Sequence, residues 1–223
     1  MGKGITYLIN ALNSFADLIY YKDESCLICG REDSDLLCSS CREKIKKIDE
    51  PTELKLDKEG FMVYSYAYYG NVLRELMLRL KYKKEYLSAE LFSAFLFDKL
   101  KETGINPEVI TYIPIREENK EKRGYNQCEL IGKGLSKLTG IKAAELLVID
   151  KAAKDQIGLS PMERFKNMEG KFRCLCYSKY KDKNILLIDD VVTTGATVYQ
   201  GAAALKKYYK GNIYILTVAK SRL

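Results

Sequence analysis

Two adjacent acids follow an apolar run in the stretch ILLIDDVVTTGATV, residues 185–198. The carboxylates of Asp189 and Asp190 accept hydrogen bonds, and the Thr-Thr-Gly-Ala-Thr segment at 193–197 then offers hydroxyl and backbone N–H donors. A glycine lets the backbone approach a ligand closely, and the start of a helix favours a phosphate. Because acceptors come before donors, the stretch predicts a site for a molecule with two hydroxyls close to a phosphate, such as a ribose 5-phosphate.

Two other sites that contain similar residues do not fit this sequence. A receiver-type domain also has a strand that ends in two aspartates, but it needs another aspartate downstream, and no Asp or Glu follows Asp190. A P-loop needs the pattern GxxxxGK[ST], which is missing here, and the GKG at 132–134 lies in a helical pattern with no strand before it. A purely structural turn would leave two costly acids beside an apolar run.

Four of the seven cysteines form two CxxC pairs in the stretch CLICGREDSDLLCSSC. Cys26, Cys29, Cys38 and Cys41 can bring four thiolates to one Zn²⁺ at about 2.3 Å, and Gly30 permits the tight turn after the first pair. Four thiolates leave no open coordination position, so the zinc is predicted to be structural and to hold a module too small to fold by burial alone. Disulfides would require an oxidising compartment, and no signal sequence is found.

The chain has no histidine, and its formal charge is +7. Proton transfer and metal binding therefore depend on Asp, Glu, Lys, Tyr or Cys. The other three cysteines, Cys128, Cys174 and Cys176, are predicted to fill core or surface positions. In residues 5–21, apolar side chains recur at helical spacing between polar ones, which predicts an amphipathic helix docked on the body and no membrane span. We therefore expect a cytoplasmic protein.

The elements that position these residues alternate between strands and helices. Near-continuously apolar strands between helical patterns predict an α/β fold with a mainly parallel sheet covered on both faces. Strands are expected at 61–69, 109–115, 145–149, 172–178, 184–190 and 212–220; helices at 72–82, 87–100, 125–138, from Ser160 onward, and at 196–209; and a charged loop at 116–124. Residues 1–50 are expected to form the helix and zinc module, 51–60 a linker, and 61–223 the main domain.

Several motifs together carry a resemblance to a known family. The stretch 185–198 resembles the phosphoribosyl pyrophosphate (PRPP) binding motif of type I phosphoribosyltransferases. With the CxxC pairs, LKYKKEYL at 80–87, RGYNQ at 123–127 and KDQIGLSPMERFKNMEGKF at 154–172, the chain resembles the ComF family of late competence proteins over nearly its whole length. Within the stretch 154–172, the residues that match the family are Gln156, Leu159, Ser160, Arg164 and Asn167.

The resemblance implies a type I phosphoribosyltransferase-like domain preceded by a four-cysteine zinc module, and a role in the uptake of single-stranded DNA during natural transformation. It implies that Asp189 and Asp190 bind the ribose hydroxyls and that the loop at 116–124 folds over a diphosphate with Mg²⁺. The implied catalytic residues are Arg123, Asp189 and Asp190, and the other implied substrate-binding residues are Arg116, Lys122, Gly124, Asn126, Gln127, Thr193, Thr194, Gly195, Ala196 and Thr197. For Lys120, a solvated turn is the simpler interpretation.

The sequence leaves the activity open. One hypothesis is transfer of a ribose phosphate with loss of pyrophosphate, and no residue identifies the acceptor. Another is a non-catalytic adaptor that senses PRPP and engages DNA-uptake proteins, at the membrane through those partners and without insertion of its own. A third is direct binding of single-stranded DNA, since the segment 79–86 interleaves cations with Tyr82 and Tyr86. The same residues also fit one polar helix face.

Overall fold

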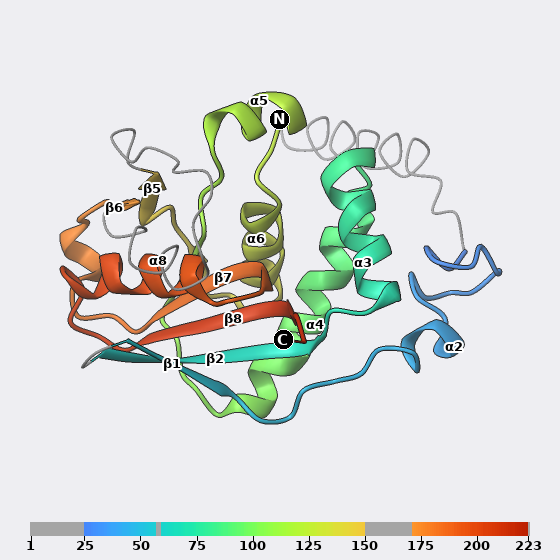
Figure 1. The fold of residues 1–223 in the computed structure, drawn as a ribbon, viewed down its shortest axis with the longest axis horizontal. Helices are drawn as coiled ribbons and strands as arrows, with labels where there is room; N and C mark the ends of the chain where they lie inside the picture. Colours follow the sequence, from blue (N-terminus) through green and yellow to red (C-terminus); the bar gives the residue numbers. More distant parts are fainter. Residues whose placement is uncertain (1–24, 57–58, 150–170, 223) are drawn as a thin grey trace, which may run out of the picture.

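Figure 1 shows the computed structural model of the chain, which describes residues 25–56, 59–149 and 171–222. A six-stranded sheet has the order β1-β2-β8-β7-β3-β4, and its neighbouring strands are parallel except β1 and β2. Strands β5 and β6 form a separate antiparallel pair. The predicted fold class is confirmed: a mainly parallel sheet flanked by helices follows an N-terminal cysteine cluster.

The bounds of the elements follow the alternation of the sequence. The strands are β1 Thr52–Leu56, β2 Glu59–Tyr68, β3 Val109–Tyr112, β4 Lys142–Ala143, β5 Leu147–Ile149, β6 Phe172–Cys174, β7 Ile185–Val192 and β8 Ile213–Lys220. The helices are α2 Ser39–Arg42, α3 Asn71–Leu78, α4 Leu87–Thr103, α5 Glu117–Arg123, α6 Gln127–Thr139 and α8 Ala196–Lys206. A π-helical turn, η1 Arg79–Lys83, continues α3, and a 3₁₀ turn, η2 Ser178–Tyr180, precedes β7.

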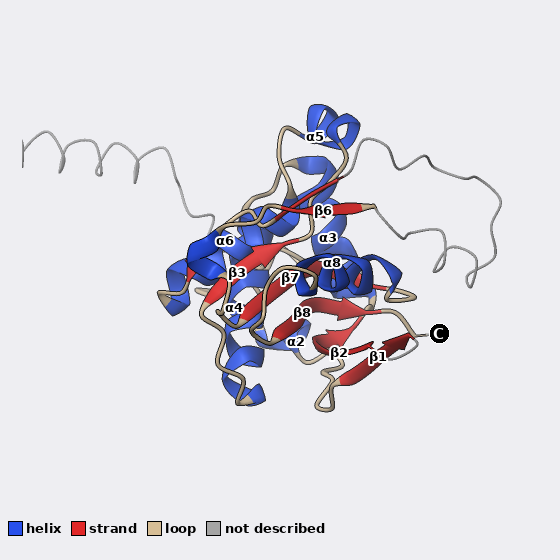
Figure 2. Ribbon diagram, turned by 90° about the vertical axis from the view of Figure 1, so that its left-hand side faces the viewer, coloured by secondary structure: helices blue, strands red, loops and turns tan. Residues whose placement is uncertain are grey.

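Alternate residues of β7 face two different helical layers. Leu186 and Ile188 pack into the cluster that includes α4 and α6, whereas Ile185 and Leu187 pack into the cluster that includes α8. These four side chains are completely buried, since β7 lies between β8 and β3 and helices cover both faces of the sheet (Figure 2). The apolar run before the acids is therefore a central strand, and its end lies at the carboxyl edge of the sheet.

The cysteine module is joined to the main core. Cys26, Leu37, Cys38 and Cys41 belong to the same buried cluster as side chains of α4. Hydrogen bonds also extend the sheet toward the module, because the backbone N–H of Ile48 donates to Tyr66 and that of Tyr68 donates to Lys46. The cysteine module thus shares apolar surface with the main domain.

The structure corrects two expectations near the start and the middle of the chain. The stretch 51–60, expected as a linker, contains β1, which pairs antiparallel with β2 as an edge strand. The stretch 116–124, expected as a charged loop, contains α5. Its first turn carries Glu117 and Glu118, its last turn is basic, and it ends at Gly124 with φ +84°. This order of charges complements the helix dipole, so charges that fit a solvated turn in the sequence stabilise a helix.

Two further differences concern strands. The segments expected at 145–149 and 172–178 form the separate β5-β6 pair and do not join the parallel sheet. The strand expected at 109–115 ends at Tyr112. The expected helix in 5–21, the helix expected from Ser160 and the motif residues of 156–167 lie outside the described residues. Within the part of the chain that the structure describes, no helix has the length and apolar character needed to cross a membrane.

Candidate functional site

The two predicted acids lie together near the end of β7. Asp189 and Asp190 are 7% and 6% exposed, and their carboxylate oxygens lie within 4.8 Å of each other and of the Cys128 sulfur. The sequence predicted that the strand ends at the two acids. Strand β7 instead continues through both of them to Val192. Backbone groups hold them: the N–H of Asp190 donates to Asp189 Oδ1 at 2.9 Å, and that of Val191 donates to Asp190 Oδ1 at 2.6 Å.

Asp190 has two side-chain donors on the same oxygen. Lys81 Nζ lies 2.5 Å from Asp190 Oδ2, and Gln127 Nε2 donates to that oxygen at 3.0 Å. Burial by itself lowers the pKa of Lys81, but the charge of Asp190 and the hydrogen bond to it outweigh this and raise the pKa above its ordinary value. Lys81 is therefore a charged ammonium group that neutralises Asp190.

Asp189 lies in a different environment. Its Oδ1 atom accepts a hydrogen bond from the Cys128 thiol at 3.4 Å. Burial, and then the charge of Asp190, raise the pKa of Asp189 to about 7. Burial and the two nearby carboxylates raise the pKa of Cys128 well above its ordinary value, so this thiol stays protonated and donates. Near neutral pH, Asp189 therefore shares its population between its protonated and ionised forms.

The sequence did not assign Lys81 or Cys128 to this site. It predicted only a filler position for Cys128, although this residue directly follows the RGYNQ motif, and that adjacency was the available signal. It indicated Lys81 only as part of a polar or DNA-binding face. No sequence spacing predicts the contact of Lys81 with Asp190, because the contact depends on how η1 packs over the sheet edge.

The RGYNQ motif supports the acids of β7. Arg123 Nη1 donates to Gln127 Oε1 at 3.0 Å, and its guanidinium lies 5.6 Å from the ring centre of Tyr82. Asn126 caps α6: its Oδ1 accepts from the Cys128 N–H at 2.9 Å, and its Nδ2 donates to the Ile113 carbonyl at 2.9 Å. Arg123 therefore reaches the acids through Gln127, while Asn126 fixes the start of α6 against the chain after β3.

The threonine loop leads from β7 into α8. Thr193 and Thr194 are exposed and Thr197 is half-buried. Gly195 caps α8 with φ +82°, a conformation that glycine adopts without steric cost, and the side chain of Leu54 from β1 lies against it. The N–H of Ala196 points back to Thr194 Oγ1 at 3.4 Å. The loop thus presents hydroxyls and the first turn of α8 at the edge where the acids lie.

Three cations belong to the segments around α5 and β6. Arg116 precedes α5 and is half-buried, and Lys122 on α5 is exposed. Lys171, which the sequence did not single out, lies just before β6, and burial and the positive charge of Arg116 lower its pKa. Like charges that approach each other in this way favour a negatively charged group between them.

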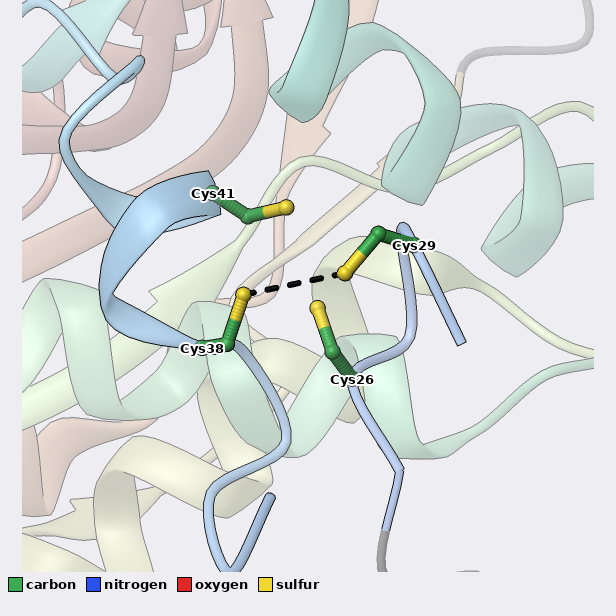
Figure 3. Close-up of side chains that lie close together, drawn as sticks. All are labelled: Cys26, Cys29, Cys38 and Cys41. Carbon is green, nitrogen blue, oxygen red and sulfur yellow. Dashed lines mark hydrogen bonds between the residues drawn. The ribbon is translucent and has the colours of Figure 1, made fainter. Parts of the chain in front are cut away.

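Figure 3 shows the second candidate site, in which four cysteine sulfurs converge. The sulfur atoms of Cys26, Cys29, Cys38 and Cys41 all lie within 4.8 Å of one another, and those of Cys29 and Cys38 are 3.7 Å apart. Four sulfurs at about 2.3 Å from a tetrahedral metal would be separated by about 3.8 Å. The cluster therefore has the donor atoms and the spacing to hold a metal ion.

The thiol pKa values of this cluster also fit a cation. Burial raises the pKa of Cys26, but hydrogen bonds from backbone N–H groups outweigh it and bring the value to about 6. Burial and the hydrogen bonds from the other three cysteines raise the pKa of Cys41 to about 12, and the Cys26 charge adds to this. The surroundings thus favour a thiolate at Cys26 and disfavour one at Cys41, and a divalent ion would supply the positive charge that a thiolate at Cys41 needs.

The comparisons with known proteins agree with the motifs. No family model matches the chain. The chain is 28% identical to Competence protein ComFC of Streptococcus pneumoniae over 206 residues, 78% of this chain and 89% of that protein. It is 23% identical to Competence protein F of Haemophilus influenzae over 207 residues, 83% of this chain and 90% of that protein. These relatives support the assignment of the chain to the ComF family. Another relative, DNA utilization protein YhgH of Escherichia coli, is 28% identical over 145 residues, 62% of this chain and 63% of that protein.

Solved structures similar to this chain include phosphoribosyltransferases. Adenine phosphoribosyltransferase from Thermoanaerobacter pseudethanolicus matches 80% of this chain and 96% of its own, with 11% identity and a TM-score of 0.43. Glutamine PRPP amidotransferase from B. subtilis matches 58% of this chain and 25% of its own, with 16% identity and a TM-score of 0.40. These TM-scores describe a partial structural overlap.

Proposed function

We propose that this ComF-family protein acts in DNA uptake and binds PRPP, or a related ribose phosphate, at the carboxyl edge of β7. The observation that carries the proposal is the convergence of two buried carboxylates beside the threonine loop that opens α8. The names of the relatives, which include competence and DNA utilization proteins, support the DNA-uptake part.

The arrangement matches the polarity of a ribose 5-phosphate. The ribose hydroxyls would donate to Asp189 and Asp190, and each hydrogen bond to a carboxylate would contribute about 1.5–3 kcal/mol. The 5-phosphate would accept from the hydroxyls of Thr193 and Thr194 and from the N–H groups of the first turn of α8, where the helix dipole favours negative charge. A phosphate placed directly against the acids would be repelled, so this polarity orients the ligand.

The diphosphate of PRPP needs further positive charge. Arg116, Lys122 and Arg123 lie on or beside α5, and Lys171 adds a fourth cation near Arg116. Mg²⁺ bound with PRPP would neutralise part of the diphosphate charge and would be held mainly by the ligand's own oxygens and water. In a transfer reaction the bond from the anomeric carbon to the diphosphate breaks and a bond to an acceptor forms, and Arg123 would stabilise the departing pyrophosphate.

Calorimetric titration of PRPP with Mg²⁺ tests the proposal directly. We expect binding to the wild type and no measurable binding to the Asp189→Asn, Asp190→Asn double variant. Pyrophosphate release in the same samples separates a transferase from a non-catalytic PRPP sensor. Unchanged affinity in the double variant would refute the assigned site, and binding without release would favour the sensor.

A second candidate function is contact with single-stranded DNA. Tyr82 and Tyr86 are 69% and 49% exposed, and Lys83 and Lys84 beside them are exposed as well. Exposed rings stack on bases while cations pair with phosphates, and such binding weakens steeply with salt. Fluorescence anisotropy with a labelled oligonucleotide at about 50 and about 200 mM salt, with a Tyr82→Ala variant, tests it; no binding at low salt would exclude it.

We also infer that Cys26, Cys29, Cys38 and Cys41 hold Zn²⁺ as a structural ion. The convergence of the four sulfurs supports this role, because four thiolate ligands leave no open coordination position. Zinc content can be measured by atomic emission on the purified protein, and a ratio far below one ion per chain would contradict the inference.

A further inference from the structure

At the proposed ribose site, a cation of the protein already contacts one of the two acids. Asp190 Oδ2 has two donors, Lys81 Nζ at 2.5 Å and Gln127 Nε2 at 3.0 Å, and its Oδ1 accepts from the Val191 N–H. A ribose hydroxyl that donates to Asp190 must therefore displace one of these donors or share the oxygen with it. Ligand binding therefore depends on which of the two donors, Lys81 or Gln127, can move away from Asp190.

Gln127 is the less movable of the two donors. It is 5% exposed, it lies in the first turn of α6, and its Oε1 accepts from Arg123. Lys81 carries its ammonium on a flexible four-carbon stem, its side chain is 21% exposed, and it comes from a turn that is not a regular α-helix. Lys81 can therefore withdraw from Asp190 while Gln127 keeps the carboxylate in place.

The backbone that carries Lys81 has the features of a movable segment. The π-helical turn η1 ends at Lys84, which has φ +57°, and among the described residues it is the one residue other than glycine with a positive φ. A lysine in this conformation is less stable than a glycine would be, and π-helical turns are frequent at functional sites. The Tyr125 hydroxyl donates to the Leu80 carbonyl, and the Arg123 guanidinium lies near the Tyr82 ring. A movement of η1 would therefore change the contacts of the RGYNQ motif, which also holds Gln127.

The other cations of η1 do not reach the acids. Arg79 donates to Glu75 at 2.8 Å and lies 3.6 Å from Glu85. Lys83 is 67% exposed on its side chain and lies 3.9 Å from Glu75. Among the three cations of η1, Lys81 is thus the one that contacts Asp190. Lys83, two residues away, offers a matched control.

We propose that Lys81 exchanges partners on ligand binding: in the free protein it is the counter-ion of Asp190, and when a ribose diphosphate enters, its ammonium leaves the carboxylate and pairs with the diphosphate. The proposal rests on the proposed function of the acid pair. The exchange frees Asp190 for the ribose hydroxyls, and it moves a positive charge toward a ligand that would otherwise face two carboxylates. It makes Lys81 a binding residue that selects ligands carrying a diphosphate on the anomeric carbon over those with a single phosphate.

The test compares two ligands in three proteins at pH 8, where Asp189 is mainly ionised. PRPP and ribose 5-phosphate, each with Mg²⁺, are titrated by calorimetry into the wild type, Lys81→Met and Lys83→Met. Methionine keeps the apolar stem and removes the charge. We expect Lys81→Met to weaken PRPP binding by at least about tenfold and to leave ribose 5-phosphate binding unchanged or tighter, because the competing ammonium is gone. Lys83→Met should change neither by more than about twofold.

A conservative variant and a structural readout complete the test. Lys81→Arg retains the charge and should restore most of the preference for PRPP, even if Lys81→Met folds poorly. In the wild type, PRPP should change hydrogen exchange in residues 79–85 more than ribose 5-phosphate does. Equal losses for both ligands in Lys81→Met and Lys81→Arg would overturn the exchange and make Lys81 a purely structural counter-ion. Absence of binding of either ligand to the wild type would instead refute the proposed function, and the exchange with it.

Discussion

The substitution Asp189→Asn tests whether the buried carboxylate of Asp189 lowers the free energy of unfolding of the protein. Burial and the charge of Asp190 raise the pKa of Asp189 from 3.8 to about 7. When folding raises the pKa of a carboxyl, the unfolded chain releases its proton at a lower pH, so stability falls as pH rises from the unfolded to the folded pKa. By this linkage, the acid lowers the free energy of unfolding by about 4 kcal/mol above pH 7 and by about 2 kcal/mol at pH 5.

Asparagine removes this titration and keeps much of the geometry. Its carbonyl oxygen can still accept from the Cys128 thiol and from the Asp190 N–H, which donate to Asp189 Oδ1. We expect Asp189→Asn to be more stable than the wild type at pH 8, and this advantage to shrink by about 2–3 kcal/mol at pH 5. Urea denaturation at pH 5, 6, 7 and 8 measures the difference.

Two features make the measurement decisive. The cysteine cluster is the same in both proteins, so any pH dependence of metal binding cancels in the comparison. Asp182→Asn, at an exposed position, serves as the control and should show little change at any pH. A stability difference between Asp189→Asn and the wild type that is equal at pH 5 and pH 8 would refute the reasoning, and so would a loss of stability at pH 8.

Three other variants test separate parts of the structure. Cys29→Ser with Cys41→Ser, or a strong chelator, should raise hydrogen exchange in residues 25–48 and lower the melting temperature, while the central strands stay protected; a module that keeps its protection without metal would contradict the zinc assignment. Arg123→Ala should weaken PRPP more than ribose 5-phosphate, and an equal loss for both would argue against a diphosphate role. Gly195→Ala should destabilise by about 1–2 kcal/mol because of its positive φ. Part of any additional loss should be recovered by Leu54→Ala, since a Cβ at position 195 would lie 2.6 Å from that side chain; a silent Gly195→Ala would refute the turn geometry.

The local patterns of the sequence determined much of the fold. The apolar run before Asp189 predicted a strand buried on both faces, and β7 is the central strand that it required. The CxxC spacing predicted that four sulfurs meet, and they do. The motif at 185–198 predicted acids followed by a glycine turn and a helix, and the structure has this order. Patterns of this kind are readable because they repeat with the period of one element or lie within one short loop.

Charge patterns were harder to read than apolar ones. Residues 116–124 carry alternating acids and bases, which fit a solvated turn as well as a helix, and only the observed order along α5 shows how the charges complement its dipole. Residues 51–60 have few apolar side chains, and an edge strand needs few, because it gains its hydrogen bonds from one neighbour only. In both places the sequence pattern was too weak to predict the helix α5 or the strand β1.

The partners of the acids were decided by tertiary structure alone. Gln127 meets Asp190 across 63 residues of sequence, and Cys128 meets Asp189 across 61. Lys81 reaches Asp190 from the π-helical turn that follows α3, across more than one hundred residues of sequence. The sequence named the acids and the chemistry that they favour, because side-chain type is local. It could not give their counter-ion or the pKa of Asp189, because burial and charge pairing depend on which distant segments pack together.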